Sequence, residues 1–122
     1  NRDAARVFRD SVERDLPGKR LIFIMGVLAD KEYEEVVRQT VSLAAEVITV
    51  MTPDNPRALP AEELANTVKK YNSHVQAAES LAAAVDLAYE KAEKEDAIVA
   101  FGSLSYLGEM TRLVWKKTGR EE

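Results

Sequence analysis

The chain has 122 residues, the length of one domain, and 46% of them are hydrophobic and 31% charged. It contains no cysteine, which excludes disulfide bonds, thiolate metal sites and a cysteine nucleophile, and which fits a reducing, cytoplasmic environment. The net charge of -4 argues against general nucleic-acid binding, and no apolar run approaches the ~20 residues of a membrane-spanning helix.

The first half of the chain alternates helix-like and strand-like segments. Apolar residues recur at every fourth position between residues 4 and 16, which predicts an amphipathic helix that ends at Pro17. Residues 21–28 form a nearly continuous apolar run, as expected of a strand buried on both faces. Helical spacing returns over residues 33–41, and residues 47–51 are again β-branched and strand-like.

The second half continues the alternation. Pro60 suits the first turn of a helix, and acidic residues follow it while lysines come near the expected end. Residues 74–78 give a weak strand pattern. The remaining expected elements are an alanine-rich helix over 81–94, a strand over 97–101 and a last helix over 106–117.

Helices that alternate with buried strands imply right-handed crossovers and a mostly parallel sheet. We therefore expect an α/β fold, a Rossmann-like mostly parallel sheet with helices on both faces, in which residues 1–122 form a single domain. In such a sheet, ligands bind beyond the carboxyl ends of the strands.

Three of these strand ends carry unusual polar residues: Ala29-Asp30-Lys31, Thr52-Pro53-Asp54-Asn55-Pro56-Arg57, and Gly102-Ser103-Leu104-Ser105-Tyr106. Lys31 and Arg57 offer positive charges, and Ser103 and Ser105 offer hydroxyl donors. This set suits a small carboxylate or phosphate. A plainer interpretation also exists for each. Asp-Lys is a common helix cap, Pro-Asp-Asn-Pro is a favourable turn, and Gly-Ser often precedes a helix.

The same sequence lacks the parts of several complete active sites. It contains no Gly-rich phosphate loop of either common form, which is the usual means of holding ATP. We find no metal-ligand cluster and no nucleophile paired with a base, so we assign no catalytic residue and no metal ligand. The only histidine, His74, has no partner at triad or ligand spacing and is expected at the surface or in a strand.

The three loops resemble those of the C-terminal domain of the folylpolyglutamate and dihydrofolate synthases, relatives of the Mur peptidoglycan ligases. The matching stretches are residues 25–31, residues 52–59, and residues 101–104 with 108–109. Asn1 resembles the last residue of the family's Asp-Gly-Ala-His-Asn motif. The resemblance covers essentially the whole chain.

The resemblance implies an ATP-dependent amide ligase. ATP phosphorylates a folate or dihydropteroate carboxylate, and the amino group of L-glutamate attacks the acyl phosphate. ATP and Mg²⁺ would be bound mainly by an N-terminal domain that is absent from this sequence. Lys31, Arg57 and Ser103 would bind glutamate.

The resemblance also implies that Asp30, Asp54, Asn55 and Asn1 shape these loops or face the nucleotide. Many family members have Tyr directly after Gly-Ser-Leu, whereas this chain has Ser105 and then Tyr106, which leaves the role of that ring open.

Several points remain open from the sequence. A Mur-type peptidoglycan amino-acid ligase is the close alternative, and a non-catalytic receiver-like binding module is the distant one. A receiver needs acidic residues at the end of its first strand, whereas this strand ends in Gly26-Val27-Leu28, followed by one aspartate, Asp30. The sequence does not distinguish dihydropteroate from tetrahydrofolate as the acceptor, because the residues that contact the pterin would lie outside this domain.

The match of Asn1 to the end of a motif predicts a chain truncated at its N-terminus. We expect such a fragment to be inactive alone, because it lacks the phosphate loop. We also expect it to self-associate, because a missing strand would leave an open sheet edge.

Overall fold

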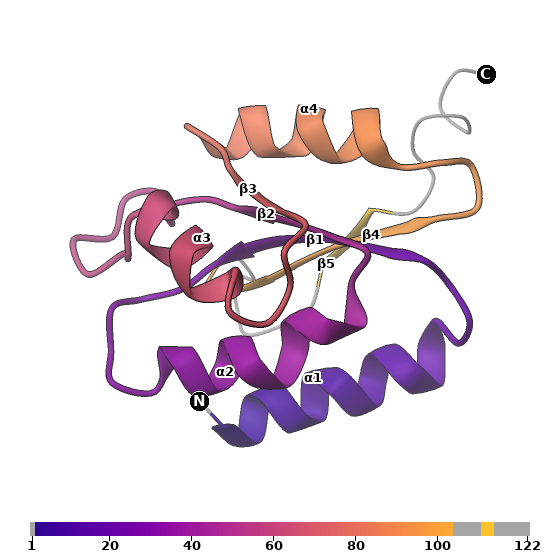
Figure 1. Cartoon of the computed structure of the whole chain (residues 1–122), viewed down its shortest axis with the longest axis horizontal. Coiled ribbons are helices and arrows are strands. Elements are labelled where there is room, and N and C mark those ends of the chain that lie inside the picture. Colours follow the sequence, from indigo (N-terminus) through magenta and orange to yellow (C-terminus); the bar gives the residue numbers. More distant parts are fainter. Residues whose placement is uncertain (1, 104–110, 114–122) are drawn as a thin grey trace.

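The computed structural model describes residues 2–103 and 111–113. Its elements in chain order are α1 (Arg2–Asp15), β1 (Leu21–Gly26), α2 (Tyr33–Thr40), the 3₁₀ turn η1 (Val41–Leu43), β2 (Glu46–Thr49), α3 (Ala61–Val68), β3 (Val75–Ala77), α4 (Leu81–Lys91), β4 (Ala97–Gly102) and β5 (Thr111–Leu113). The strands form one sheet in the order β3-β2-β1-β4-β5 (Figure 1).

The predicted α/β fold is confirmed. Strands β1 to β4 are mutually parallel, and β5 pairs with β4 in the antiparallel sense at the edge. Every side chain of β1 is buried, as the continuous apolar run predicts for a central strand covered on both faces. The register aligns Met25 with Thr49 of β2 and Gly26 with Gly102 of β4, so three strands end side by side.

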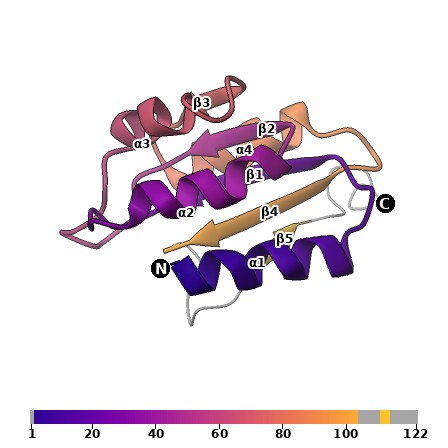
Figure 2. The same cartoon turned by 60° about the horizontal axis from the view of Figure 1, so that its bottom comes forward.

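Helices cover both faces of the sheet, as Figures 1 and 2 show. Helices α1, α2 and α3 pack on one face and α4 on the other, and two hydrophobic clusters mark the two faces. Alternate residues of β1 divide between these clusters: Phe23 and Met25 face α1 to α3, whereas Ile22 and Ile24 face α4. The period of two follows from the pleat of the strand.

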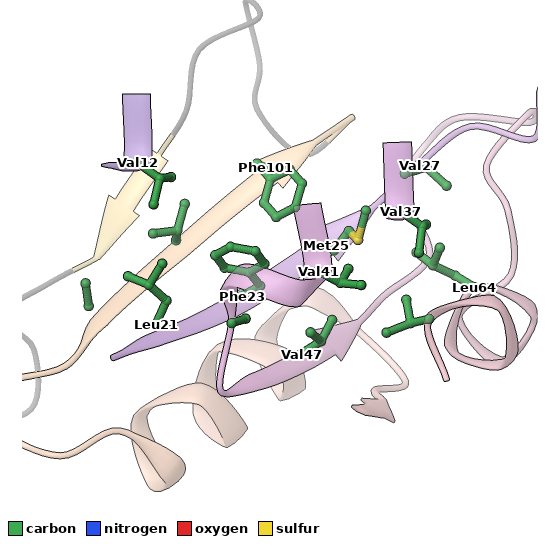
Figure 3. Close-up of a cluster of buried hydrophobic side chains, with 14 of the residues drawn as sticks. Val12, Leu21, Phe23, Met25, Val27, Val37, Val41, Val47, Leu64 and Phe101 are labelled. Atoms are coloured by element: carbon green, nitrogen blue, oxygen red, sulfur yellow. The ribbon is translucent and has the colours of Figure 1, made fainter. Parts of the chain in front are cut away.

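Aromatic rings fix the carboxyl end of β4 in the larger cluster (Figure 3). The ring of Phe101 stacks on Phe8 of α1 with centroids 4.1 Å apart and meets Phe23 of β1 edge-on at 5.0 Å. Such pairs contribute about 0.5–1.5 kcal/mol each beyond the area they bury. The backbone that follows Phe101 therefore starts from a firmly packed position.

The amino ends of β1 and β4 are joined by polar contacts at the opposite edge. The nearly buried carboxylate of Asp96 accepts hydrogen bonds from the guanidinium of Arg20 and, at 2.7 Å, from the N–H of Glu93. The contact with Glu93 also explains where helix α4 (Leu81–Lys91) ends. Residues 81–94 are the predicted helix, but α4 ends at Lys91, and the chain then turns so that Asp96 can cap the loop.

The last predicted helix, over residues 106–117, is wrong within the described residues of that range, 111–113. Thr111–Leu113 forms β5 and pairs with Ile98, Val99 and Ala100 of β4. Without β5, the edge of β4 would present a row of unpaired N–H and C=O groups, and β5 pairs with them. The helical spacing of residues 106–117 is a local pattern and does not predict this pairing. The rest of that prediction lies outside the described residues, as do Asn1, Ser105 and Tyr106.

Candidate functional site

The candidate site lies at the carboxyl edge of the sheet, where the loops after β1, β2 and β4 begin. Because these strands are parallel and in register, Asp30 and Lys31, residues 52–57, and Ser103 follow strand ends at the same edge. The side chains of Lys31 and Arg57 are exposed, and Ser103 is half-buried. The sequence-predicted residues within the described part of the chain are thus brought to one edge.

The first two loops are tied together by a short antiparallel bridge. Leu28 and Ala58 are bridge partners, the N–H of Ala29 donates to the Arg57 carbonyl at 2.8 Å, and the N–H of Leu59 donates to the Val27 carbonyl at 3.0 Å. The predicted strand over residues 21–28 therefore ends early, at Gly26, because the chain leaves the sheet to form this bridge. The bridge holds the backbone of Arg57 beside the loop that carries Lys31.

The loop after β1 is shaped by Asp30. Its side-chain oxygen accepts a hydrogen bond from the N–H of Glu32 at 2.9 Å, and its backbone N–H donates to the Leu28 carbonyl. An Asp that bonds the backbone two residues on is a common turn device. Lys31 stands inside this turn, which leaves its side chain exposed at the start of α2.

The loop after β2 has a comparable internal scaffold. Asp54 has a φ of 58°, the left-handed conformation that Asp and Asn adopt more easily than most residues. The Asn55 side chain accepts a hydrogen bond from the N–H of Arg57 at 2.9 Å, and its carbonyl accepts one from Ala58 at 3.0 Å. These contacts set the direction in which the chain passes through Arg57.

Ser103 is anchored by its backbone and by its side chain. Its N–H donates to the carbonyl of Gly26 at 2.8 Å, and its hydroxyl is hydrogen-bonded to the hydroxyl of Thr52. The preceding residue, Gly102, has a φ of 87° and lies so close to β1 that an added Cβ would stand 2.1 Å from the Gly26 oxygen. Only glycine fits at this position. The close approach of Gly102 to β1 places Ser103 beside the end of β1.

Thr52 is the residue that sequence reasoning missed. It is only 7% exposed, and its hydroxyl reaches across to the loop after β4. In the sequence Thr52 lies directly before Pro53, a position typical of the start of a turn. This local context does not predict its hydrogen bond with Ser103, 51 positions away.

The pKa shifts that the structure resolves lie between helices rather than at the strand ends. A hydrogen bond from the Tyr71 hydroxyl, at 2.9 Å, and then one from Lys70 lower the pKa of Glu34, and the same contact raises the pKa of Tyr71. A hydrogen bond to Glu35 raises the pKa of Arg38. All of these groups lie on the exposed surface between α2 and the end of α3, away from the candidate site.

The described residues show neither a metal-binding cluster nor a membrane-spanning helix. Residues 2–103 and 111–113 contain no group of three or more His, Cys, Asp or Glu residues that would hold a metal ion. Among the helices of that part of the chain, none has the length and apolar character needed to cross a bilayer.

Comparison with known proteins identifies the family of the chain. Residues 1–104 match the family described as "Mur ligase, glutamate ligase domain". The chain belongs to this family. No curated protein shows significant similarity to the chain.

Solved structures of two folylpolyglutamate synthases share the fold. The Mycobacterium tuberculosis enzyme complexed with ADP superimposes with a TM-score of 0.67 and 24% identity, over 74% of this chain and 20% of that one. The Thermotoga maritima enzyme gives a TM-score of 0.65 and 25% identity, over 82% of this chain and 22% of that one. This chain therefore spans about a fifth of the length of these two synthases.

Proposed function

We propose that this chain is the glutamate-binding domain of a longer cytoplasmic, ATP-dependent ligase that adds L-glutamate to a folate or to dihydropteroate. The family supplies the ligase class, and the likeness to two folylpolyglutamate synthases favours a pterin-containing acceptor. The observation that carries the proposal is the bridge between Leu28 and Ala58, because it brings the loops of two cations to the edge where Ser103 is anchored.

In this proposal the chain binds and orients glutamate. Lys31 and Arg57 attract its carboxylates, and the guanidinium of Arg57 can hold one of them through two parallel hydrogen bonds. Ser103 donates its hydroxyl proton to a carboxylate oxygen. Held in this way, the amino group of glutamate faces the acyl phosphate that ATP has generated on the acceptor, attacks its carbonyl carbon and displaces phosphate. Most of the rate gain from such binding comes from orientation.

ATP and Mg²⁺ belong mainly to the remainder of the ligase in this proposal. The sequence has no Gly-rich phosphate loop, and the described residues contain no metal-ligand group, so no step of phosphate activation is assigned to this chain. Its contribution to the nucleotide side is limited to the loops shaped by Asp30, Asp54 and Asn55, with Asn1 at the start of the chain.

Steady-state kinetics of the full-length ligase test the assignment. Lys31→Ala and Arg57→Ala should each raise KM for glutamate about ten- to a hundredfold, the value of a lost charge-assisted hydrogen bond, and change KM for ATP little. Arg57→Lys should recover part of the loss, because it keeps the charge but not the planar fork. Lys94→Ala is the matched control, since this exposed lysine precedes β4 at the opposite edge of the sheet. Equal effects on both substrates would contradict the proposal.

The Mur-type peptidoglycan ligase is the second candidate, favoured by the name of the family itself. It uses the same edge of the sheet for an amino acid but a different acid acceptor. Offering the full-length protein a dihydropteroate, a tetrahydrofolate and a muramoyl-peptide acceptor in parallel separates the two. Glutamate-dependent release of phosphate with only the muramoyl acceptor would favour the second candidate. Family membership leaves the receiver-like module without support.

A further inference from the structure

The strongest unassigned feature of the site is the contact between the hydroxyls of Thr52 and Ser103. Thr52 follows β2 and Ser103 follows β4, and these two strands flank β1 on its two sides. The contact therefore crosses the carboxyl end of β1, at the point where the N–H of Ser103 also donates to Gly26. It joins two of the loops that the proposed function uses.

The direction of this hydrogen bond follows from proton counting. A carboxylate accepts hydrogen bonds and cannot donate them, whereas a serine hydroxyl has one proton to give. If Ser103 gives that proton to glutamate, its bond with Thr52 must use the Ser103 oxygen as acceptor and Thr52 as donor. Thr52 suits this role because it is 7% exposed, so water does not compete readily for its proton.

We propose that Thr52 is a positioning residue that donates its hydroxyl proton to Ser103 and thereby turns the Ser103 proton toward the glutamate carboxylate. The inference rests on the proposed function and deepens it. A half-buried serine hydroxyl without such a donor rotates among staggered positions, and only some of these face the ligand. Donation from Thr52 also polarises the Ser103 hydroxyl, which strengthens its bond to the anion.

The structure offers a matched control in a second buried threonine. Thr49 lies on β2, is fully buried, and donates to the carbonyl of Ala61 at 2.8 Å, a contact within the scaffold. Replacing either threonine by valine keeps the branched shape and puts a methyl group in place of the hydroxyl. A loss of stability is expected of both changes, whereas a change in glutamate binding is expected only of Thr52→Val.

The test uses the full-length ligase and compares KM for glutamate, KM for ATP and kcat. Thr52→Val should raise KM for glutamate about two- to tenfold, the range for one neutral hydrogen bond. Its KM for ATP and its kcat should stay within about twofold of the values for the unmodified enzyme. Thr52→Ser, which keeps the hydroxyl, and Thr49→Val should both leave KM for glutamate near its original value. In a Ser103→Ala background, Thr52→Val should have no further effect on it.

Three outcomes would overturn the inference, and they differ in whether the proposed role of Ser103 also fails. An unchanged KM for glutamate in Thr52→Val, with a raised one in Ser103→Ala, removes only the role of Thr52. An equal rise in Thr49→Val and Thr52→Val shows a general structural effect. If Ser103→Ala itself leaves KM for glutamate unchanged, the role of Ser103 in the proposed function fails and that of Thr52 falls with it.

Discussion

Replacing Gly102 by alanine tests how tightly the site depends on the fold. The substitution adds a single methyl group at the last residue of β4. Two costs arise there. The backbone has a φ of 87°, which an L-residue with a Cβ adopts only with strain, and the new Cβ would lie 2.1 Å from the carbonyl oxygen of Gly26.

The second cost is not easily relieved, because the obstructing atom belongs to the backbone. The Gly26 carbonyl accepts the N–H of Ser103 at 2.8 Å, and Gly26 and Gly102 are paired residues of the adjacent strands β1 and β4. The strain at positive φ costs about 1–2 kcal/mol. Forcing an extra methyl into a packed position costs about 1–3 kcal/mol more. Gly102→Ala should therefore destabilise the domain by roughly 2–5 kcal/mol.

Gly18→Ala supplies the matched control. Gly18 has a similar φ of 75°, but nothing lies within 4 Å of an added Cβ. This variant carries the first cost without the second, so its loss should be about 1–2 kcal/mol. Thermal unfolding followed by circular dichroism should then show a drop in Tm of roughly 6–25 °C for Gly102→Ala and roughly 3–10 °C for Gly18→Ala. Equal drops in the two variants would refute the argument from close approach.

Two further predictions concern stability. Asp96→Ala should destabilise the domain by about 1–3 kcal/mol, because it leaves the N–H of Glu93 and the guanidinium of Arg20 without their partner. The control is Asp15→Ala, which removes an exposed ion pair with Arg14 and should cost under about 0.5 kcal/mol. A denaturant titration measures both. The lowered pKa of Glu34 means that its contribution is present above the pKa of the unfolded chain and is lost as pH falls through the folded value. Glu34→Gln and Tyr71→Phe should thus each lower Tm slightly at pH 7, and the gap should close as the pH falls through the lowered pKa of Glu34; a gap that persists in more acidic solution would contradict this.

The parts of the fold that the sequence predicts are those set by local pattern. Residues 21–28 and 97–101 are continuous apolar runs, and such runs indicate central parallel strands whatever their partners are. The first helix is likewise predicted by the four-residue spacing of its apolar residues, and its end is predicted by Pro17. The edge strand at Thr111–Leu113 is different, because its conformation depends on the backbone groups that β4 offers, and no local spacing encodes them.

The same distinction applies to the site. Asp30, Asn55 and Arg57 carry recognisable turn and charge chemistry, so their loops are visible in the sequence, and the roles given to them stay predictions. The bridge from Leu28 to Ala58 and the hydroxyl pair of Thr52 with Ser103 join segments that are far apart in the chain. Long-range pairs of this kind emerge only when the sheet order is known.

The sheet order explains why a weak sequence signal, Gly102-Ser103, becomes a specific one in the structure. From β1 the chain moves through α2 and α3 toward β3 on one face, and it returns through α4 on the other face to add β4 on the far side of β1. The direction of the sheet therefore reverses between β1 and β4, and open α/β sheets bind ligands at the carboxyl end of that junction. At this junction the close strands require a residue without a Cβ, and the next residue is the first that can carry a side chain toward a ligand. The fold demands the glycine and the proposed chemistry uses the serine, so the two requirements meet in adjacent positions.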